Sequence, residues 1–315
     1  DPDSEAGLTT MMQTLETEDA PTTFSPPMLT AAPAVSADSA QKALRLGDIL
    51  VLPGKAIPSE EQTNGARLII RLPCVVGAWG SGSHATTRLM LRLLQTPPLL
   101  ERLRAGSCNV CDFGHGSGVL ALAAVALGEG CGTRATGVDI EPSSVAGARE
   151  NASASGGELA SRCHFVLPPA SFLTKDLDFS ARFGDWRSYP AADILPEPAH
   201  QFDIVVANIL PGPLTALAPT LAALLKPGGV LAITGCQSFQ VAHLMTVYAS
   251  AGVPLRPLLR DDTGGKWVLL VGGEGAAGLA DDDAEFGFRR HAAGAAAVAA
   301  AAAVAAGGPA APIEE

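Results

Sequence analysis

The stretch Cys111-Asp-Phe-Gly-His-Gly-Ser-Gly118 decides the fold class, because it follows an apolar strand-like run and opens an apolar helix-like run. Its glycines allow a sharp turn and a close approach of the backbone to a ligand. A dinucleotide fingerprint needs its third glycine three residues after the second, where this chain has Val119. The spacing Asp-x-Gly-x-Gly-x-Gly therefore favours S-adenosylmethionine, which carries no pyrophosphate, over a nicotinamide cofactor.

Downstream of this stretch, short β-rich runs alternate with helical runs, which is typical of parallel βαβ units. The run Asp261-Asp-Thr-Gly-Gly265 is too short for a parallel crossover, so it predicts an antiparallel hairpin. We predict an α/β, Rossmann-like fold: a mostly parallel seven-stranded sheet, a terminal antiparallel hairpin, and helices on both faces. The expected strands are 109–113, 135–140, 164–167, 202–209, 230–234, 255–260 and 266–271, and the expected helices are 120–127, 143–154, 214–225 and 238–251.

The two ends of the chain differ from its middle. Residues 1–40 are rich in Ser, Thr, Pro and Ala, and residues 275–315 are mostly Ala and Gly, so both are expected to be disordered. Two further strands, at 47–53 and 67–72, and a helix from near His84 extend the core at its front, which gives a domain over 41–274. Residues 175–200 interrupt the alternation as an insertion, either a functional lid or a disordered excursion.

Composition excludes some classes of partner. The 21 basic and 32 acidic residues give a formal charge of −11, which disfavours extended nucleic-acid binding. The alanine run near the end is too short and too weakly apolar for a membrane span, so no membrane is expected. The six cysteines lack the spacing of a disulfide framework, which favours a reducing compartment. The first residue is Asp1 rather than Met, as in a fragment or a processed form, and the compartment stays open between the cytoplasm and an organelle.

An acidic residue is expected at the ribose of the cofactor. Asp139 lies about 20 residues beyond Gly118, at the end of the strand 135–140, where a carboxylate accepts hydrogen bonds from both ribose hydroxyls. Glu141 is the neighbouring candidate, but its side chain is expected on the opposite face of the strand. Asp112 is expected to orient the glycine loop or the ammonium group of the cofactor. The predicted cofactor-binding residues include Asp112, Gly114, Gly116, Gly118 and Asp139.

Asn208 is the candidate catalytic residue. It follows the buried apolar run of the strand 202–209, at the carboxyl edge where ligands bind in such sheets. Methylation of an amine needs a neutral nitrogen held in line with the methyl group, and an amide oxygen with a nearby backbone carbonyl can hold it by its hydrogens. The alternative is a strand-end amide that caps a turn.

Four motifs, in this order, resemble the bacterial methyltransferases of ribosomal protein L-eleven (L11), which are class I S-adenosylmethionine-dependent enzymes. The similarity spans roughly residues 47–273. It implies methyl transfer to lysine side-chain and N-terminal amines of this large-subunit ribosomal protein. It also implies that Thr87, Gly114, Asp139 and Asn208 contact the cofactor, and that His84 shapes a loop. The motifs are Gly80-Ser-Gly-Ser-His-Ala-Thr-Thr87, Asp112-Phe-Gly-His-Gly-Ser-Gly118, Val138-Asp-Ile-Glu-Pro142 and Val206-Ala-Asn-Ile-Leu-Pro-Gly-Pro-Leu214.

Four departures from the family pattern concern the substrate more than the cofactor, and the insertion at 175–200 is one of them. The family's amino-terminal recognition domain has no counterpart here, His115 replaces the usual cysteine, and Ala85 replaces the usual proline. Alternative functions are therefore a methyltransferase of another protein, a small-molecule amine or a glutamine amide, or a non-catalytic cofactor-binding module. The run Asn208-Ile-Leu-Pro211 favours an amine over a glutamine amide, for which Asn-Pro-Pro-Tyr is common.

No metal site is expected. Cys108 and Cys111 lie in and beside a strand, where positions three apart face opposite ways, and no second pair accompanies them. His164 and His243 are interpreted as structural histidines with satisfied hydrogen bonds. The pair at Asp261 and Asp262 is interpreted as a solvated turn.

Overall fold

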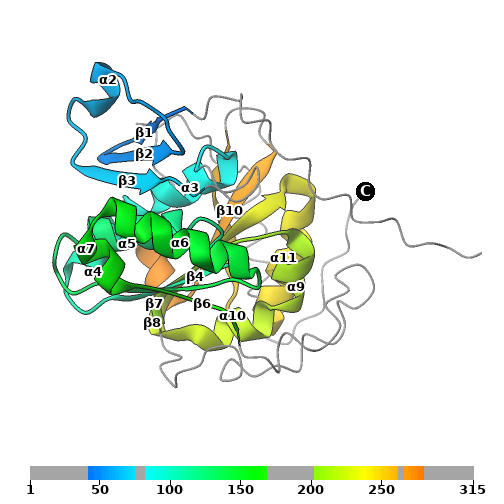
Figure 1. Cartoon of the computed structure of the whole chain (residues 1–315). Coiled ribbons are helices and arrows are strands. Elements are labelled where there is room, and N and C mark those ends of the chain that lie inside the picture. The colour runs from blue at the N-terminus through cyan, green and yellow to red at the C-terminus, as the bar shows by residue number, and fades with distance from the viewer. Residues whose placement is uncertain (1–41, 75–81, 169–201, 262–265, 280–315) are drawn as a thin grey trace, which may run out of the picture. The chain divides into compact units, whose positions relative to one another are not determined.

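The strands that flank the glycine motif form one seven-stranded sheet in the computed structural model, which describes residues 42–74, 82–168, 202–261 and 266–279 (Figure 1). The sheet order is β6-β5-β4-β7-β8-β10-β9, in which β10 runs antiparallel to both of its neighbours and the other pairs are parallel. The predicted fold class is thus confirmed, including the terminal hairpin. The bounds are β4 Asn109–Phe113, β5 Arg134–Val138, β6 Cys163–Val166, β7 Phe202–Asn208, β8 Leu225–Gln237, β9 Leu255–Arg260 and β10 Trp267–Gly272.

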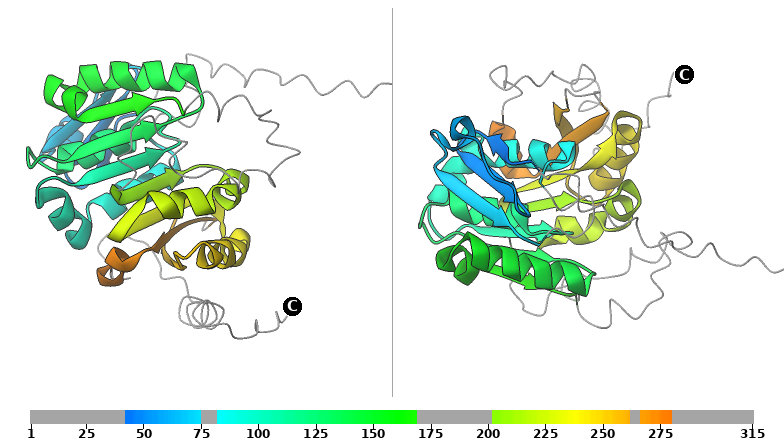
Figure 2. Two further views of the ribbon diagram at one scale, coloured as in Figure 1. Left: turned by 90° about the horizontal axis from the view of Figure 1, so that it is seen from below. Right: turned by 45° about the horizontal axis from the view of Figure 1, so that its top comes forward.

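Helices cover both faces of this sheet (Figure 2). Alternate residues of β7 face opposite ways: Ile204 and Val206 belong to one core cluster, and Val205 and Ala207 to the other. The first cluster includes residues of α3 Ala85–Leu94, α4 Pro97–Arg104, α5 Val119–Leu127 and α6 Pro142–Ser155, with α7 Gly157–Arg162 packed beside it. The second includes residues of α9 Pro211–Ala216, α10 Ala218–Leu224 and α11 Val241–Ser250.

The helix predicted over 214–225 is two helices, α9 and α10. Pro219 has no backbone N–H to donate to the fourth residue before it, so a continuous helix is broken at this point. The helix predicted over 238–251 begins instead with the 3-10 turn η3 Ser238–Gln240, and α11 follows it. Both corrections concern where a helix begins or breaks, and the helices still lie in the predicted parts of the chain.

The strands predicted at 47–53 and 67–72 belong to a separate sheet and do not add strands to the seven-stranded one. This three-stranded sheet has the order β1-β2-β3, with β1 antiparallel and β3 parallel to β2, and α2 Glu60–Thr63 lies between β2 and β3. Its apolar side chains join the first core cluster, so the expected extension of the core at the front is right. The bounds are β1 Leu44–Leu46, β2 Ile49–Pro53 and β3 Leu68–Leu72.

The described chain ends in the 3-10 helix η4 Glu274–Gly278, beyond the domain limit predicted at 274. Ala276 and Leu279 are buried against the first core cluster. The proposed insertion at 175–200 and the segment 1–40 lie outside the described residues, as does the tail from 280. No helix of the described part is long and apolar enough to cross a membrane.

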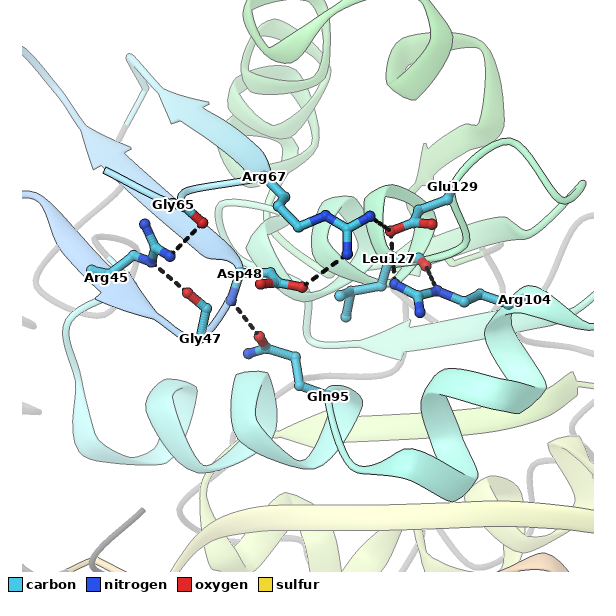
Figure 3. A network of polar contacts seen from close by, with 9 residues as sticks. All are labelled: Arg45, Gly47, Asp48, Gly65, Arg67, Gln95, Arg104, Leu127 and Glu129. Atoms are coloured by element: carbon cyan, nitrogen blue, oxygen red, sulfur yellow. Dashed lines mark hydrogen bonds and ion pairs between the residues drawn. The ribbon is translucent and has the colours of Figure 1, made fainter. Parts of the chain in front are cut away.

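A polar network fastens the three-stranded sheet to the helices beneath it (Figure 3). Glu129 forms ion pairs with Arg104 at 2.7 Å and with Arg67 at 3.3 Å. Arg67 also lies 3.8 Å from Asp48, whose backbone N–H donates to Gln95 at 3.1 Å. Glu129 thereby links a residue next to β3 with the end of α4.

Replacing Glu129 with glutamine is expected to lower the free energy of unfolding by about 1 kcal/mol or less, because its partners are partly exposed to water. The loss should shrink at high salt, which screens exposed ion pairs. Urea unfolding at low and high salt measures both effects. Glu158→Gln is the matched control and should cost less, because Glu158 is more exposed than Glu129 and pairs with one arginine, Arg162. If the free energy of unfolding lost in Glu129→Gln does not depend on salt, this interpretation is contradicted.

Candidate functional site

The carboxyl ends of β5, β4 and β7 meet at one edge of the main sheet. The chain runs from β4 to β5 and β6, and then returns to the opposite side of β4 as β7. Ligands of open α/β sheets bind beside such a reversal. The glycine loop follows β4, Asp139 follows β5, and Asn208 ends β7, so the fold brings three of the predicted site segments together.

The glycine loop has one open side. Gly114, Gly116 and Gly118 all have positive φ angles, of 74°, 52° and 78°. A Cβ on Gly114 would overlap the side chain of Ile209, and a Cβ on Gly118 would lie 2.7 Å from the Phe165 ring. At Gly116 a Cβ would meet nothing within 4 Å. Gly114 and Gly118 therefore serve close packing, while Gly116 presents bare backbone to open space.

Asp139 ties two loops of this edge together. Its Oδ2 accepts the Gly116 N–H at 2.9 Å, and its Oδ1 accepts the Glu141 N–H at 3.0 Å. A carboxylate oxygen can accept more than one hydrogen bond, so both oxygens keep capacity for hydroxyl donors. The Asp139 side chain is half-buried, whereas Glu141 is exposed, which makes Asp139 the better placed of the two candidates.

Thr87 and Asn208 meet although they are far apart in the sequence. The Asn208 Nδ2 donates to the Thr87 Oγ1 at 3.3 Å. Thr87 is buried in the first turn of α3. Because this bond engages the amide nitrogen, it turns the amide oxygen of Asn208 the opposite way. The pairing brings the fourth segment, the end of the Gly80–Thr87 motif, to the same edge; residues 75–81 lie outside the described part.

His84 caps the helix that carries Thr87. Its Nδ1 accepts the Thr86 N–H at 3.3 Å, and its ring packs edge-on against Trp267 of β10, with centroids 5.2 Å apart. Burial lowers the pKa of His84, and the nearby Asp261 carboxylate opposes that shift. Asp261 is buried, so its interpretation as a solvated turn residue is wrong, and Asp262 lies outside the described residues.

Ile209, which the sequence analysis missed, is held between two glycines. Its side chain fills the space that a Cβ on Gly114 would need, and its carbonyl oxygen occupies the position of a Cβ on Gly235. Gly235 has a φ of 96°, which a larger residue rarely adopts. The backbone directly after Asn208 is thereby fixed against β8.

Asp112 is buried and bonds to the helix that follows the glycine loop. Its carboxylate is 1% exposed, and its Oδ2 accepts the Ala121 N–H at 3.0 Å, which caps α5 because the N-cap residue Gly118 has no side chain to do so. Its Oδ1 has no hydrogen-bond partner in the described part of the chain. Of our two expectations, orienting the loop fits the bond to Ala121, and a contact with the ammonium group of the cofactor stays a prediction.

Burial raises the pKa of Asp112 from 3.8 to about 7. Between these pH values the folded protein holds a proton that the unfolded chain has released, so this group's contribution to stability falls as the pH rises through that window. Asp112→Asn, which stays neutral and keeps an acceptor for Ala121, is expected to raise the free energy of unfolding on the order of 2 kcal/mol at pH 8 and to change it little below pH 4. Chemical unfolding of both proteins across this pH range tests it; an equal difference at every pH would contradict it.

His115, at the position where the family usually has cysteine, is accommodated by a glycine on the neighbouring strand. A Cβ on Gly137 would lie 2.9 Å from the His115 ring and 2.6 Å from the Phe165 ring. The two rings pack at 4.9 Å between centroids, and burial lowers the pKa of His115. Its Nδ1 also lies 3.0 Å from the Gly116 carbonyl, so His115 contributes both packing and a polar contact to the glycine loop.

Asn151, in the middle of α6, is a second residue that the sequence analysis missed. Its side chain is fully buried and bonds to the backbone of Cys74 and Ser117. A sequence signal exists: asparagine disfavours helix interiors, and here it falls on the apolar stripe with Ala148 and Ala152. The signal belongs to no motif, so by itself it does not point to a site.

The remaining candidates lie outside this edge. Cys108 and Cys111 are buried, unpaired thiols, and burial raises the pKa of Cys108 to about 12. His164 and His243 are exposed rather than packed, which corrects their interpretation. Among the described residues no three His, Cys, Asp or Glu side chains gather as metal ligands.

Comparisons with known proteins point to one family. The family model described as "Ribosomal protein L11 methyltransferase (PrmA)" matches residues 39–273. The protein of that name from Dechloromonas aromatica is 37% identical over 196 residues, 62% of this chain and 51% of that protein. Its counterpart from Pseudomonas aeruginosa is 38% identical over 195 residues, 62% and 53% of the two chains. The chain thus spans about half the length of the curated relatives it matches.

Among solved structures, the ribosomal protein L11 methylase from Lactobacillus delbrueckii subsp. bulgaricus aligns with a TM-score of 0.49 and 24% identity. The alignment covers 74% of this chain and 98% of that one.

Proposed function

Because the chain belongs to the ribosomal protein L11 methyltransferase family, we propose that it methylates amines of a large-subunit ribosomal protein, L11. The proposed acceptors are lysine side-chain amines and the N-terminal amine. S-adenosylmethionine is the cofactor of this family and fold. When bound, it supplies an electrophilic methyl group on a sulfonium sulfur.

The observation that carries the proposal is the convergence of an open glycine loop, a half-buried carboxylate and a fixed amide at one sheet edge. The bare backbone of Gly116 suits a ligand that must lie close to the loop. The carboxylate of Asp139 has acceptor capacity for ribose hydroxyls beyond its two backbone bonds. We therefore assign Gly116, Asp139, Thr87 and Asn208 to the cofactor and its reacting end, and the family resemblance adds the backbone of Gly114.

The chain's own part in the reaction is to hold the acceptor amine. The amide oxygen of Asn208 accepts one N–H of a neutral amine, and Thr87 fixes the orientation of that amide. The amine's lone pair is then free to attack, and its surplus proton leaves to solvent after the transfer. Orientation of this kind can supply about 7–11 kcal/mol of the barrier without a strong base.

Transfer of a labelled methyl group to unmethylated large ribosomal subunits tests this function. The full chain is incubated with S-adenosylmethionine labelled in its methyl group, and the labelled protein and residue are found by gel and mass spectrometry. We expect label on L11 amines, a large loss of label with Asp139→Ala, and little change with Glu141→Ala, the matched exposed acid. Cofactor binding by calorimetry without label on any subunit protein would favour a non-catalytic binding module instead.

A further inference from the structure

Two side chains of helix α6 form hydrogen bonds with the backbone of β3 and of the residues directly after it, at the edge of the three-stranded sheet. Ser155 Oγ accepts the Arg71 N–H at 2.9 Å and donates to the Arg71 carbonyl at 3.1 Å. One helical turn earlier, Asn151 Oδ1 accepts the Cys74 N–H at 2.9 Å and Asn151 Nδ2 donates to the Cys74 carbonyl at 2.8 Å. Each side chain thus pairs with both polar groups of one backbone residue, as a neighbouring strand would.

Asn151 differs from Ser155 in two respects, because it is fully buried whereas Ser155 is partly exposed, and because it makes a further bond to the glycine loop. Its Nδ2 donates at 3.0 Å to the carbonyl of Ser117, which lies between Gly116 and Gly118. Asn151 is fully buried and Ser117 is buried, so water cannot easily replace this bond. The bond holds the loop from the side of α6, while Asp139 holds it through the Gly116 N–H.

We propose that Asn151 is a positioning residue for the cofactor: it fixes the shape of the glycine loop and couples that loop to Cys74, at the end of the three-stranded sheet. Its amide makes three hydrogen bonds: the oxygen accepts one from Cys74, and the nitrogen donates one to Cys74 and one to Ser117. The loop glycines are free to adopt other conformations, so an anchor outside the loop reduces the entropy lost when a ligand binds. This inference rests on the proposed cofactor site and adds a residue to it that does not touch the cofactor.

The test compares Asn151→Ala with Ser155→Ala in the full chain. Both variants remove bonds to the sheet edge, but only Asn151→Ala removes the bond to Ser117. We expect Asn151→Ala to raise the dissociation constant of S-adenosylmethionine about tenfold, and Ser155→Ala to change it less than about twofold. Equal effects of the two variants on the constant would overturn the proposal. The unfolding midpoint, measured on the same samples, shows how much of each change is loss of fold.

A second measurement needs no variant, in case Asn151→Ala does not fold. Cys74 is partly exposed and Cys131 is exposed, so both thiols can react with an alkylating reagent in the native protein. Coupling through Asn151 predicts that saturating cofactor slows alkylation of Cys74 relative to Cys131, as mass spectrometry of the peptides would show. An unchanged ratio, with cofactor binding verified, would overturn the coupling. Failure of the wild-type chain to bind cofactor at all would count against the proposed function instead.

Discussion

Replacing Asp139 with alanine is expected to weaken the binding of S-adenosylmethionine tenfold to a hundredfold or more. A hydrogen bond to a charged group contributes about 1.5–3 kcal/mol, and the proposed ribose contact has one or two of them. The variant also frees the Gly116 N–H, which the carboxylate now holds at 2.9 Å, so the loop loses an anchor as well. Isothermal titration calorimetry gives the dissociation constant directly.

Two further variants separate these effects. Asp139→Asn keeps one acceptor oxygen and should lie between the wild type and Asp139→Ala. Glu141→Ala removes an exposed acid two residues away and leaves its backbone N–H, which donates to Asp139, so the constant should barely move. If Asp139→Ala binds the cofactor as tightly as the wild type, the ribose contact is wrong.

Replacing Asn208 with alanine is expected to lower kcat for methyl transfer about a hundredfold or more, with a change of only a few fold in cofactor affinity. The amide oxygen would hold the amine and face the positive charge that develops on it, and losing one preorganised group of comparable kind, an oxyanion-hole donor, costs on the order of 10²–10³ in kcat. Initial rates with L11 as the acceptor, at saturating cofactor, measure this change. Asn64→Ala, on the exposed surface, serves as the control.

Thr87 offers a finer test of the same arrangement. Thr87→Val keeps the shape of the side chain but removes the oxygen that accepts from Asn208 Nδ2. The amide is then free to turn, so kcat should fall by less than in Asn208→Ala, about tenfold. Thr87→Ser keeps the oxygen and should stay near the wild type. An inactive Thr87→Ser with an active Thr87→Val would contradict a role of this hydrogen bond.

The glycine motif predicted the fold class correctly because the sharp turn between the strand and the helix requires glycines at fixed positions. The strand before it was predicted with its observed bounds, Asn109–Phe113, because the glycine motif marks the turn at which a strand ends and a helix begins. The terminal hairpin followed from the length of one connection. Asp139 and Asn208 were predicted as site residues because strand ends at the edge of an α/β sheet are informative positions, and both lie at that edge.

Other features depend on contacts between distant segments, which a single sequence does not display. The side of β4 on which Asp112 lies was readable from strand alternation, but its capping of α5 was not, because the acceptor and donor come from different elements. The separate front sheet depends on the pairing of β2 with β3 across α2. Asn151 contacts residues from two distant segments, and only the folded chain brings these together.

A crystal structure of the chain with S-adenosylmethionine, or its demethylated product, tests the central claim most directly. We expect the ribose hydroxyls within hydrogen-bond distance of the Asp139 carboxylate, the ligand against the bare backbone of Gly116, and its sulfur end toward Asn208 and Thr87. A ligand bound elsewhere, or one that leaves Asp139 and Gly116 without contact, would contradict the assignment of this sheet edge as the methyl-transfer site.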